Sequence, residues 1–161
     1  MNGGVKFRAV LFDLDDTLVW DERISRQALT ETAALGAAEH GLDAGRLAAA
    51  AKRASDELWR AHAPVTRCDE LGIVAFEGMW GHFHGEEDYV KHLREWTPQF
   101  RREIWQRALA EQGVEDRKLA DQSAEFFVRR RRELSEHLPG AEEVLRTLQR
   151  AGIRIGLLTN G

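Results

Sequence analysis

Two short apolar runs lie near the ends of the chain, and a long segment of helical periodicity separates them. Residues 9–12 are apolar at every position, a pattern typical of a strand buried on both faces in a parallel sheet. Residues 153–158 predict a second buried strand. Parallel strands need a crossover connection, which is normally right-handed. We therefore expect a strand, a long helical excursion, a helix and a second strand.

The helical excursion divides into several predicted elements. A helix is expected over residues 22–40, and Asp43 is positioned to cap the next one. That helix and the two that follow carry apolar positions three and four residues apart. These positions are Leu47, Ala50, Ala51, Ala54, Leu58 and Ala61; Phe100, Ile104, Trp105, Ala108 and Leu109; and Leu119, Phe126, Phe127, Leu134 and Leu138.

Glycines mark the breaks between these elements. In residues 64–85 they interleave with aromatic residues, which indicates a connection packed by aromatic side chains, with short helical turns. Gly113 is predicted to end one helix, and Gly152 the last one. That last helix starts at Pro139-Gly140 and carries acidic residues in its first turn and arginines towards its end, matching the helix dipole.

Composition narrows the possible classes of protein. The 161 residues carry a net charge of -4, with 31% charged and 43% hydrophobic residues, so no basic excess suggests a nucleic-acid partner. Cys68 is the single cysteine, which excludes an intrachain disulfide. No apolar run has the length of a signal-peptide core or approaches the ~20 residues of a membrane span. We expect a cytoplasmic protein without a membrane partner.

Candidate chemistry follows the first strand directly. Asp13 and Asp15 are two residues apart, so in extended backbone their side chains project the same way from its carboxyl end. Ligands of open α/β sheets collect at that end. Two neighbouring carboxylates repel each other, which indicates a cation or a shared proton between them. Asp16 points to the other side and is left out of the chemistry, and Thr17 is expected to order the turn.

These residues resemble the haloacid dehalogenase superfamily. The first matching motif is Asp13-Leu14-Asp15-Asp16-Thr17 after a buried strand, and the second is Thr159 after residues 155–158. The resemblance covers essentially the whole chain. It implies an α/β fold with a Rossmann-like core, incomplete and represented by its N-terminal portion only, and an inserted α-helical cap. We expect core at residues 1–19, cap at 20–137 and core again at 138–161.

The resemblance also implies roles for individual residues. Asp13 would be the nucleophile that attacks a phosphate monoester of a small metabolite, and Asp15 the general acid and base. Mg²⁺ would be held by the Asp13 carboxylate and the Asp15 carbonyl. The Thr159 hydroxyl and the Asn160 backbone N–H would hold the phosphoryl oxygens. General chemistry agrees, because a carboxylate can act as a covalent nucleophile and a second one nearby can keep a proton at neutral pH.

Parts of the sequence also suggest other functions. A dehalogenase does not need the acid at Asp15, and a receiver domain would need short strand–helix units instead of a long helical stretch. A phosphomutase or phosphonate hydrolase of the same superfamily is an alternative, as is a truncated, non-catalytic protein acting through its helical surface. The superfamily's cation and further acidic ligands come after the second motif. Lys6 and Arg8 lie roughly 16–23 Å from the site along the strand and cannot replace that cation.

Three further features have plainer explanations. Thr159 could be an ordinary loop hydroxyl in a Thr-Asn-Gly turn. Residues 129–132 are four arginines that fan around a helix, with glutamates four residues away, which favours a solvated helix over a phosphate or nucleic-acid patch. His82, His84 and Cys68 match no structural zinc spacing.

Overall fold

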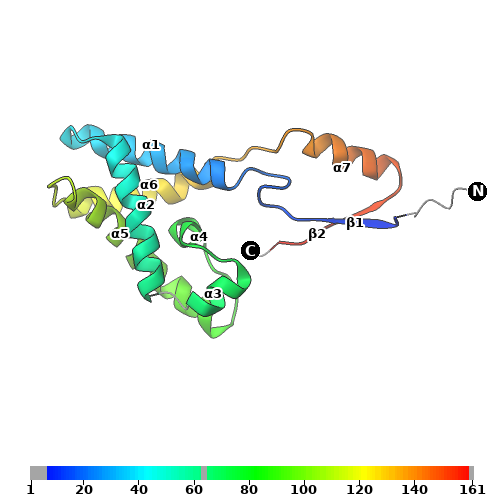
Figure 1. Ribbon diagram of the computed structural model, residues 1–161, viewed down its shortest axis with the longest axis horizontal. Coiled ribbons are helices and arrows are strands. Elements are labelled where there is room, and N and C mark those ends of the chain that lie inside the picture. Colours follow the sequence, from blue (N-terminus) through cyan, green and yellow to red (C-terminus); the bar gives the residue numbers. More distant parts are fainter. Residues whose placement is uncertain (1–6, 63–64, 160–161) are drawn as a thin grey trace, which may run out of the picture. The chain divides into compact units, whose positions relative to one another are not determined.

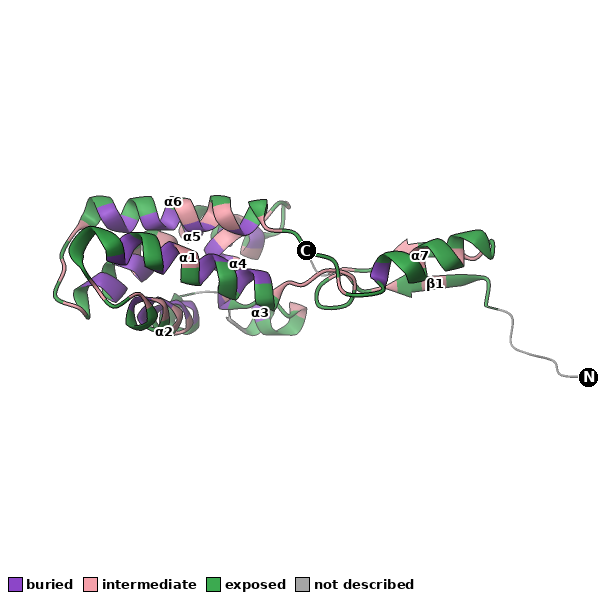
Figure 2. Cartoon of the chain, turned by 90° about the horizontal axis from the view of Figure 1, so that it is seen from above, coloured by how far each residue is buried: buried purple, intermediate pink, exposed green. Residues whose placement is uncertain are grey.

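The protein consists of two compact units, one small and containing both strands, the other entirely helical. The computed structural model describes residues 7–62 and 65–159 (Figure 1). The first unit contains the described residues up to Ile24 and those from Ser135 onward, and the second is Ser25–Leu134. Each unit has its own pattern of burial (Figure 2), so each is described by itself.

The first unit is built on a parallel pair of strands. β1 (Ala9–Phe12) pairs with β2 (Arg154–Leu157), with Ala9 opposite Arg154 and Phe12 opposite Leu157. Helix α7 (Ala141–Arg150) precedes β2 and contacts it. The predicted strands, their parallel pairing and the helix between residues 139 and 152 are confirmed. The two strands form a small parallel sheet, and together with α7 they make up an incomplete α/β core.

The strands are more exposed than their sequence pattern predicts. Leu11 is 69% exposed and Leu157 is 53% exposed, so the expectation of burial on both faces is wrong for this unit. Among the described residues β1 and β2 pair only with each other, and each keeps one open edge. An apolar strand is buried only when further strands and helices cover it, which a two-stranded sheet does not provide.

The second unit is a bundle of helices. Its elements are α1 (Glu22–His40), whose first turn belongs to the first unit, α2 (Ala44–His62), α3 (Val65–Leu71), α4 (Ala75–Trp80), α5 (Asp88–Ala110) and α6 (Arg117–Glu133). Helix α5 is central, because it contacts α2, α4 and α6. Asp43 caps α2 as predicted: its carboxylate accepts the backbone N–H of Arg46 at 2.9 Å.

The core of this unit is continuous and rich in aromatic residues. Its largest fully buried side chains include Trp105, Phe100 and Phe127. Gly78 of α4 lies against this layer so closely that an added Cβ would stand 2.3 Å from a ring carbon of Trp59 and 2.9 Å from one of Phe100. A helix of six residues is therefore held in place by packing rather than by its own propensity.

Two details of the helices differ from the sequence prediction or extend it. Helix α6 ends at Glu133, and the next residue, Leu134, has extended backbone. Leu134 and Leu138 therefore lie beyond the helix that the sequence predicts for them. The glycine-rich connection after residue 64 contains two short helices, α3 and α4. None of the helices in the described ranges combines the length and the apolar composition that crossing a membrane requires.

Candidate functional site

The candidate site lies at the carboxyl ends of β1 and β2. Asp13 follows the last residue of β1, and the ladder continues past β2, because the Leu158 N–H donates to the Phe12 carbonyl at 2.8 Å. Thr159 is the next residue, so the backbones that carry Asp13, Asp15 and Thr159 leave the same edge of the parallel pair. Asn160 lies outside the described residues. Parallel strands bring their carboxyl ends together, and this accounts for the arrangement.

A tight turn fixes the loop after Asp13. The Leu14 carbonyl accepts the backbone N–H groups of Leu18 at 2.9 Å and Val19 at 3.1 Å. Asp16 takes a left-handed backbone conformation with φ of 51°, which aspartate tolerates better than most residues. Its carboxylate accepts the Asp21 N–H at 2.9 Å and also the Glu22 N–H, so it caps the start of α1. Asp16 therefore has a structural role at the start of α1, and its exclusion from the chemistry stays a prediction.

The Asp13 carboxylate is exposed and forms no ion pair with another described residue. The Thr17 hydroxyl lies 3.5 Å from Asp13 Oδ2, at the long limit of a hydrogen bond. The sequence predicts only a turn-ordering role for Thr17, but its hydroxyl also faces the candidate nucleophile. The sequence signal for this contact is the spacing of the two residues. A tight turn brings the side chain four places after Asp13 back towards its carboxylate.

The donor set at this edge suits a hard divalent cation. The Asp13 carboxylate and the Asp15 backbone carbonyl are oxygen donors, and one exposed carboxylate with a carbonyl matches the sparse protein ligation that Mg²⁺ prefers. A second acidic group, Glu39, His40 and Asp116, lies elsewhere, on α1 and at the start of α6. There the Asp116 carboxylate already caps α6 through the Leu119 N–H, and this bond and His40 lower its pKa. Within this group Asp116 therefore serves as the cap of α6.

Other polar residues singled out from the sequence have structural positions. Cys68 is fully buried, and burial raises the pKa of its thiol, so it belongs to the core. Residues 129–132 are not the uniformly solvated face that was expected. Arg131 is only 9% exposed, lies over the Trp80 ring at 4.5 Å and donates to the Ser25 hydroxyl. The pattern missed this because the partners of Arg131 come from distant segments.

The remaining arginines of that run differ from one another. Arg129 pairs with Glu133 at 3.8 Å, as expected, and Arg130 pairs with Glu31 of α1. Arg132 does not pair with Glu136, which instead contacts Arg23. Its guanidinium donates to the Trp80 carbonyl at 3.0 Å. Three of the four arginines, residues 130–132, therefore contact other helices, whereas Arg129 pairs within α6.

Comparison with known proteins places the whole described chain in one family. Residues 7–161 match the haloacid dehalogenase-like hydrolase family. A phosphoserine phosphatase of Thermus thermophilus is 30% identical over 154 residues, which are 96% of this chain and 58% of the relative. The chain thus spans less than two thirds of the length of this relative. The match includes the strand, the carboxylate loop, the helical unit and the second strand, and the chain belongs to the haloacid dehalogenase-like hydrolase family.

Proposed function

We propose that the chain provides the nucleophile and the acid–base group of a phosphatase that hydrolyses phosphate monoesters of a small metabolite. The observation that carries this proposal is the carboxylate loop after β1, which shares a sheet edge with Thr159. Membership of a hydrolase family and a phosphatase relative support the class of reaction. The helical unit, Ser25–Leu134, is the proposed cap. The cytoplasmic location remains a prediction.

The first step uses Asp13 as a covalent nucleophile. A carboxylate oxygen of Asp13 forms a bond to phosphorus, and the bond from phosphorus to the ester oxygen breaks. The leaving oxygen takes the proton of Asp15 and departs as an alcohol. The exposed position of Asp13 supports this role, because no ion pair with a described residue blocks its approach to a substrate.

The second step returns the protein to its starting state. Asp15, now a carboxylate, accepts a proton from water as the water oxygen bonds to phosphorus. The bond from phosphorus to Asp13 breaks, and inorganic phosphate leaves. Thr159 would position the phosphoryl oxygens through its hydroxyl, and Asn160 through its N–H. The same carboxyl group acts first as acid and then as base, so no further proton carrier is required.

Mg²⁺ would be held by the Asp13 carboxylate and the Asp15 carbonyl. When bound there, it would neutralise charge on the phosphoryl oxygens. Asp13 and the dianionic phosphate repel each other, and no described cationic side chain pairs with Asp13. We therefore expect this repulsion to keep turnover low, so the test needs a readout that does not depend on turnover.

The experiment combines an activity assay with a trap of the nucleophile. Release of phosphate from an aryl phosphate and from phosphoserine is measured with and without Mg²⁺. In parallel, ¹⁹F NMR measures binding of beryllofluoride, which mimics a phosphoryl group on an aspartate. We expect Asp13→Asn to abolish both signals. Asp69→Asn, which removes an exposed carboxylate from α3, is the matched control and should retain both.

The proposal is wrong if Asp13→Asn keeps the trap signal or the activity of the control. A chain that neither turns over substrate nor binds beryllofluoride at Asp13 would favour the alternative of a non-catalytic protein that acts through its helical surface.

A further inference from the structure

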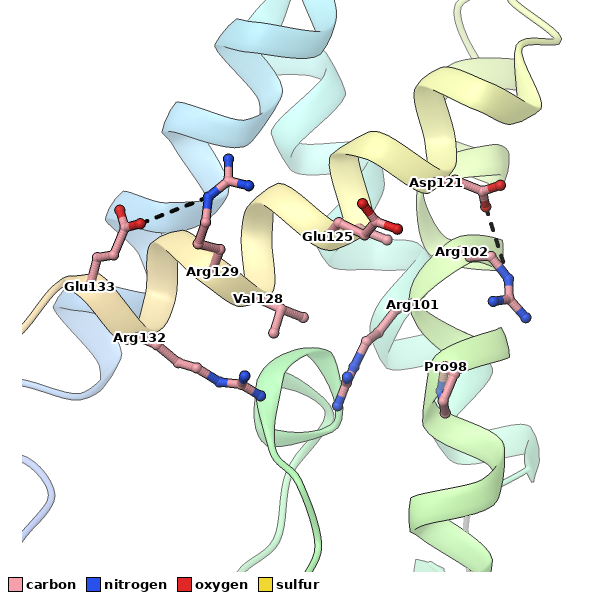
Figure 3. A pocket seen from close by; sticks show the side chains of 10 residues that line it. Pro98, Arg101, Arg102, Asp121, Glu125, Val128, Arg129, Arg132 and Glu133 are labelled. Carbon is pink, nitrogen blue, oxygen red and sulfur yellow. Dashed lines mark ion pairs between the residues drawn. The ribbon is translucent and has the colours of Figure 1, made fainter.

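A pocket of about 670 Å³ lies between α5 and α6 in the helical unit (Figure 3). Pro98 and Val128 contribute apolar lining, and four arginines and three carboxylates surround it. Two of these arginines are neutralised inside the pocket, because Arg102 pairs with Asp121 at 3.9 Å and Arg129 with Glu133 at 3.8 Å. The other two lining arginines, Arg101 and Arg132, have no such partner in the pocket.

Arg101 of α5 and Arg132 of α6 converge on the end of α4. Arg101 donates to the carbonyls of Gly78 and Gly81, and Arg132 donates to the Trp80 carbonyl between them. Figure 3 shows the two guanidinium groups pointing toward each other from opposite helices. Neither forms an ion pair with any described residue. The backbone carbonyls of residues 78, 80 and 81 thus hold two like charges close together.

Capping of α4 explains part of this arrangement. The last carbonyls of a helix lack intrahelical partners, and its end carries about half a negative charge. Arg101 and Arg132 carry two positive charges, which exceed this partial negative charge by more than one unit. Burial and the nearby Arg132 lower the pKa of Arg101 to about 10, and removal from water together with Arg132, His84 and Arg101 lowers that of His82. Glu125 is the one lining carboxylate outside the two ion pairs, so the charged side chains of the pocket sum to one net positive charge, with Arg101 and Arg132 beside the end of α4.

The geometry points to an anion-binding site at this end of the pocket, formed by Arg101 and Arg132, for a doubly charged phosphate or dicarboxylate group of a small molecule. A guanidinium has five N–H donors, and the carbonyls of residues 78, 80 and 81 use only some of them. The remaining donors can bind anionic oxygens in paired, charge-assisted hydrogen bonds. Pro98 and Val128 would contact the hydrocarbon part of such a ligand. The inference is independent of the proposed phosphatase activity.

The test is an NMR titration of the full chain with inorganic phosphate and, separately, with malonate, at constant ionic strength and without Mg²⁺. The reporter is the indole N–H of Trp80, which is buried and has no hydrogen-bond partner among the described residues, and which Trp80→Phe identifies. Phosphate is also titrated into Asp13→Asn, so that binding at the catalytic loop is separated from binding here. The anion with the lower Kd shows whether the site prefers a phosphate or a dicarboxylate group.

We expect a saturable shift of the Trp80 signal and a Kd at least about ten-fold weaker in Arg132→Met, from the loss of one charge-assisted bond. Arg132 is exposed, so this variant should fold. Arg107→Met is the matched control, because it removes an exposed arginine of α5 outside this pocket, and its Kd should change less than two-fold. Arg101→Lys keeps the charge but loses the planar fork, and should weaken binding while the fold is retained.

Two results would overturn the inference. One is the absence of any saturable shift with either anion in the wild-type chain. The other is an equal Kd in Arg132→Met and Arg107→Met, which would show that the arginines only cap α4 and that the anion responds to net charge.

Discussion

Replacing Gly78 with alanine tests the packing that holds α4 in the helical unit. The new Cβ would stand 2.3 Å and 2.8 Å from two ring carbons of Trp59 and 2.9 Å from one of Phe100. All three separations are shorter than van der Waals contact. Trp59 is 5% exposed and Phe100 is fully buried, so neither ring can swing into solvent to make room.

Two opposing terms set the size of the effect. Alanine should favour a helix over glycine by about 0.5–1 kcal/mol. Overpacking of a well-packed core costs about 1–3 kcal/mol, and rigid rings on two sides place this site at the upper end. The net destabilisation is therefore about 2 kcal/mol. With a urea dependence of about 2 kcal/mol per M, the unfolding midpoint should fall by about 1 M.

Urea unfolding followed by tryptophan fluorescence measures this change, because Trp59, Trp80, Trp96 and Trp105 all belong to the helical unit. Gly45→Ala is the matched control. Gly45 is exposed in α2, and its added Cβ would meet only a side-chain oxygen of Asp43 at 3.3 Å. That variant should be neutral or slightly stabilised. If Gly78→Ala unfolds at the same urea concentration as the wild type, α4 does not pack as closely against Trp59 and Phe100 as described here.

Three further predictions concern single side chains. In Arg132→Met the pKa of His82 should rise toward its ordinary value, measured by histidine NMR titration, because one of the charges that lower it is gone. A lowered pKa in the folded state means that protonation favours unfolding, so the contribution of His82 to stability falls as the pH drops and should fall less in this variant. Asp43→Ala should destabilise the chain by about 1 kcal/mol through loss of the α2 cap, and an unchanged urea midpoint would contradict it. Leu47→Ala should cost about 2–5 kcal/mol in the buried core, whereas Leu35→Ala, at a 55% exposed position, should stay within about 0.5 kcal/mol by the same assay.

Periodicity predicted the long helices because the burial of one helix face follows from local spacing, and the runs of apolar residues predicted the two strands. The stripe that includes Leu47 and Leu58 is buried in α2, and the helix predicted over residues 22–40 corresponds to α1. The short helical turns predicted within residues 64–85 correspond to α3 and α4. The pattern did not reveal why a glycine lies inside α4: only a residue without a side chain allows this helix to approach Trp59 so closely.

The burial of individual arginines could not be predicted from the sequence, because it depends on contacts between distant segments. Arg131 is buried because Ser25, more than a hundred residues earlier, accepts its hydrogen bond and the Trp80 ring lies beneath it. Arg101 is partly buried because backbone carbonyls of α4 accept its N–H groups. A sequence pattern assigns arginine to the solvated face unless such partners are known. The shared edge of Asp13 and Thr159 was predictable because parallel pairing alone dictates it, while their chemical roles remain predictions.

Asp16 has a consequence for how variants of the carboxylate loop must be interpreted. Its side chain ties this loop to the first turn of α1 through the N–H groups of Asp21 and Glu22. Removing the Asp16 carboxylate would free the backbone that positions Asp13 and Asp15. An inactive Asp16→Ala protein would therefore reveal misalignment rather than a third participant in bond breaking. Asp16→Asn, which keeps an acceptor oxygen for the same amides, should recover much of the lost rate.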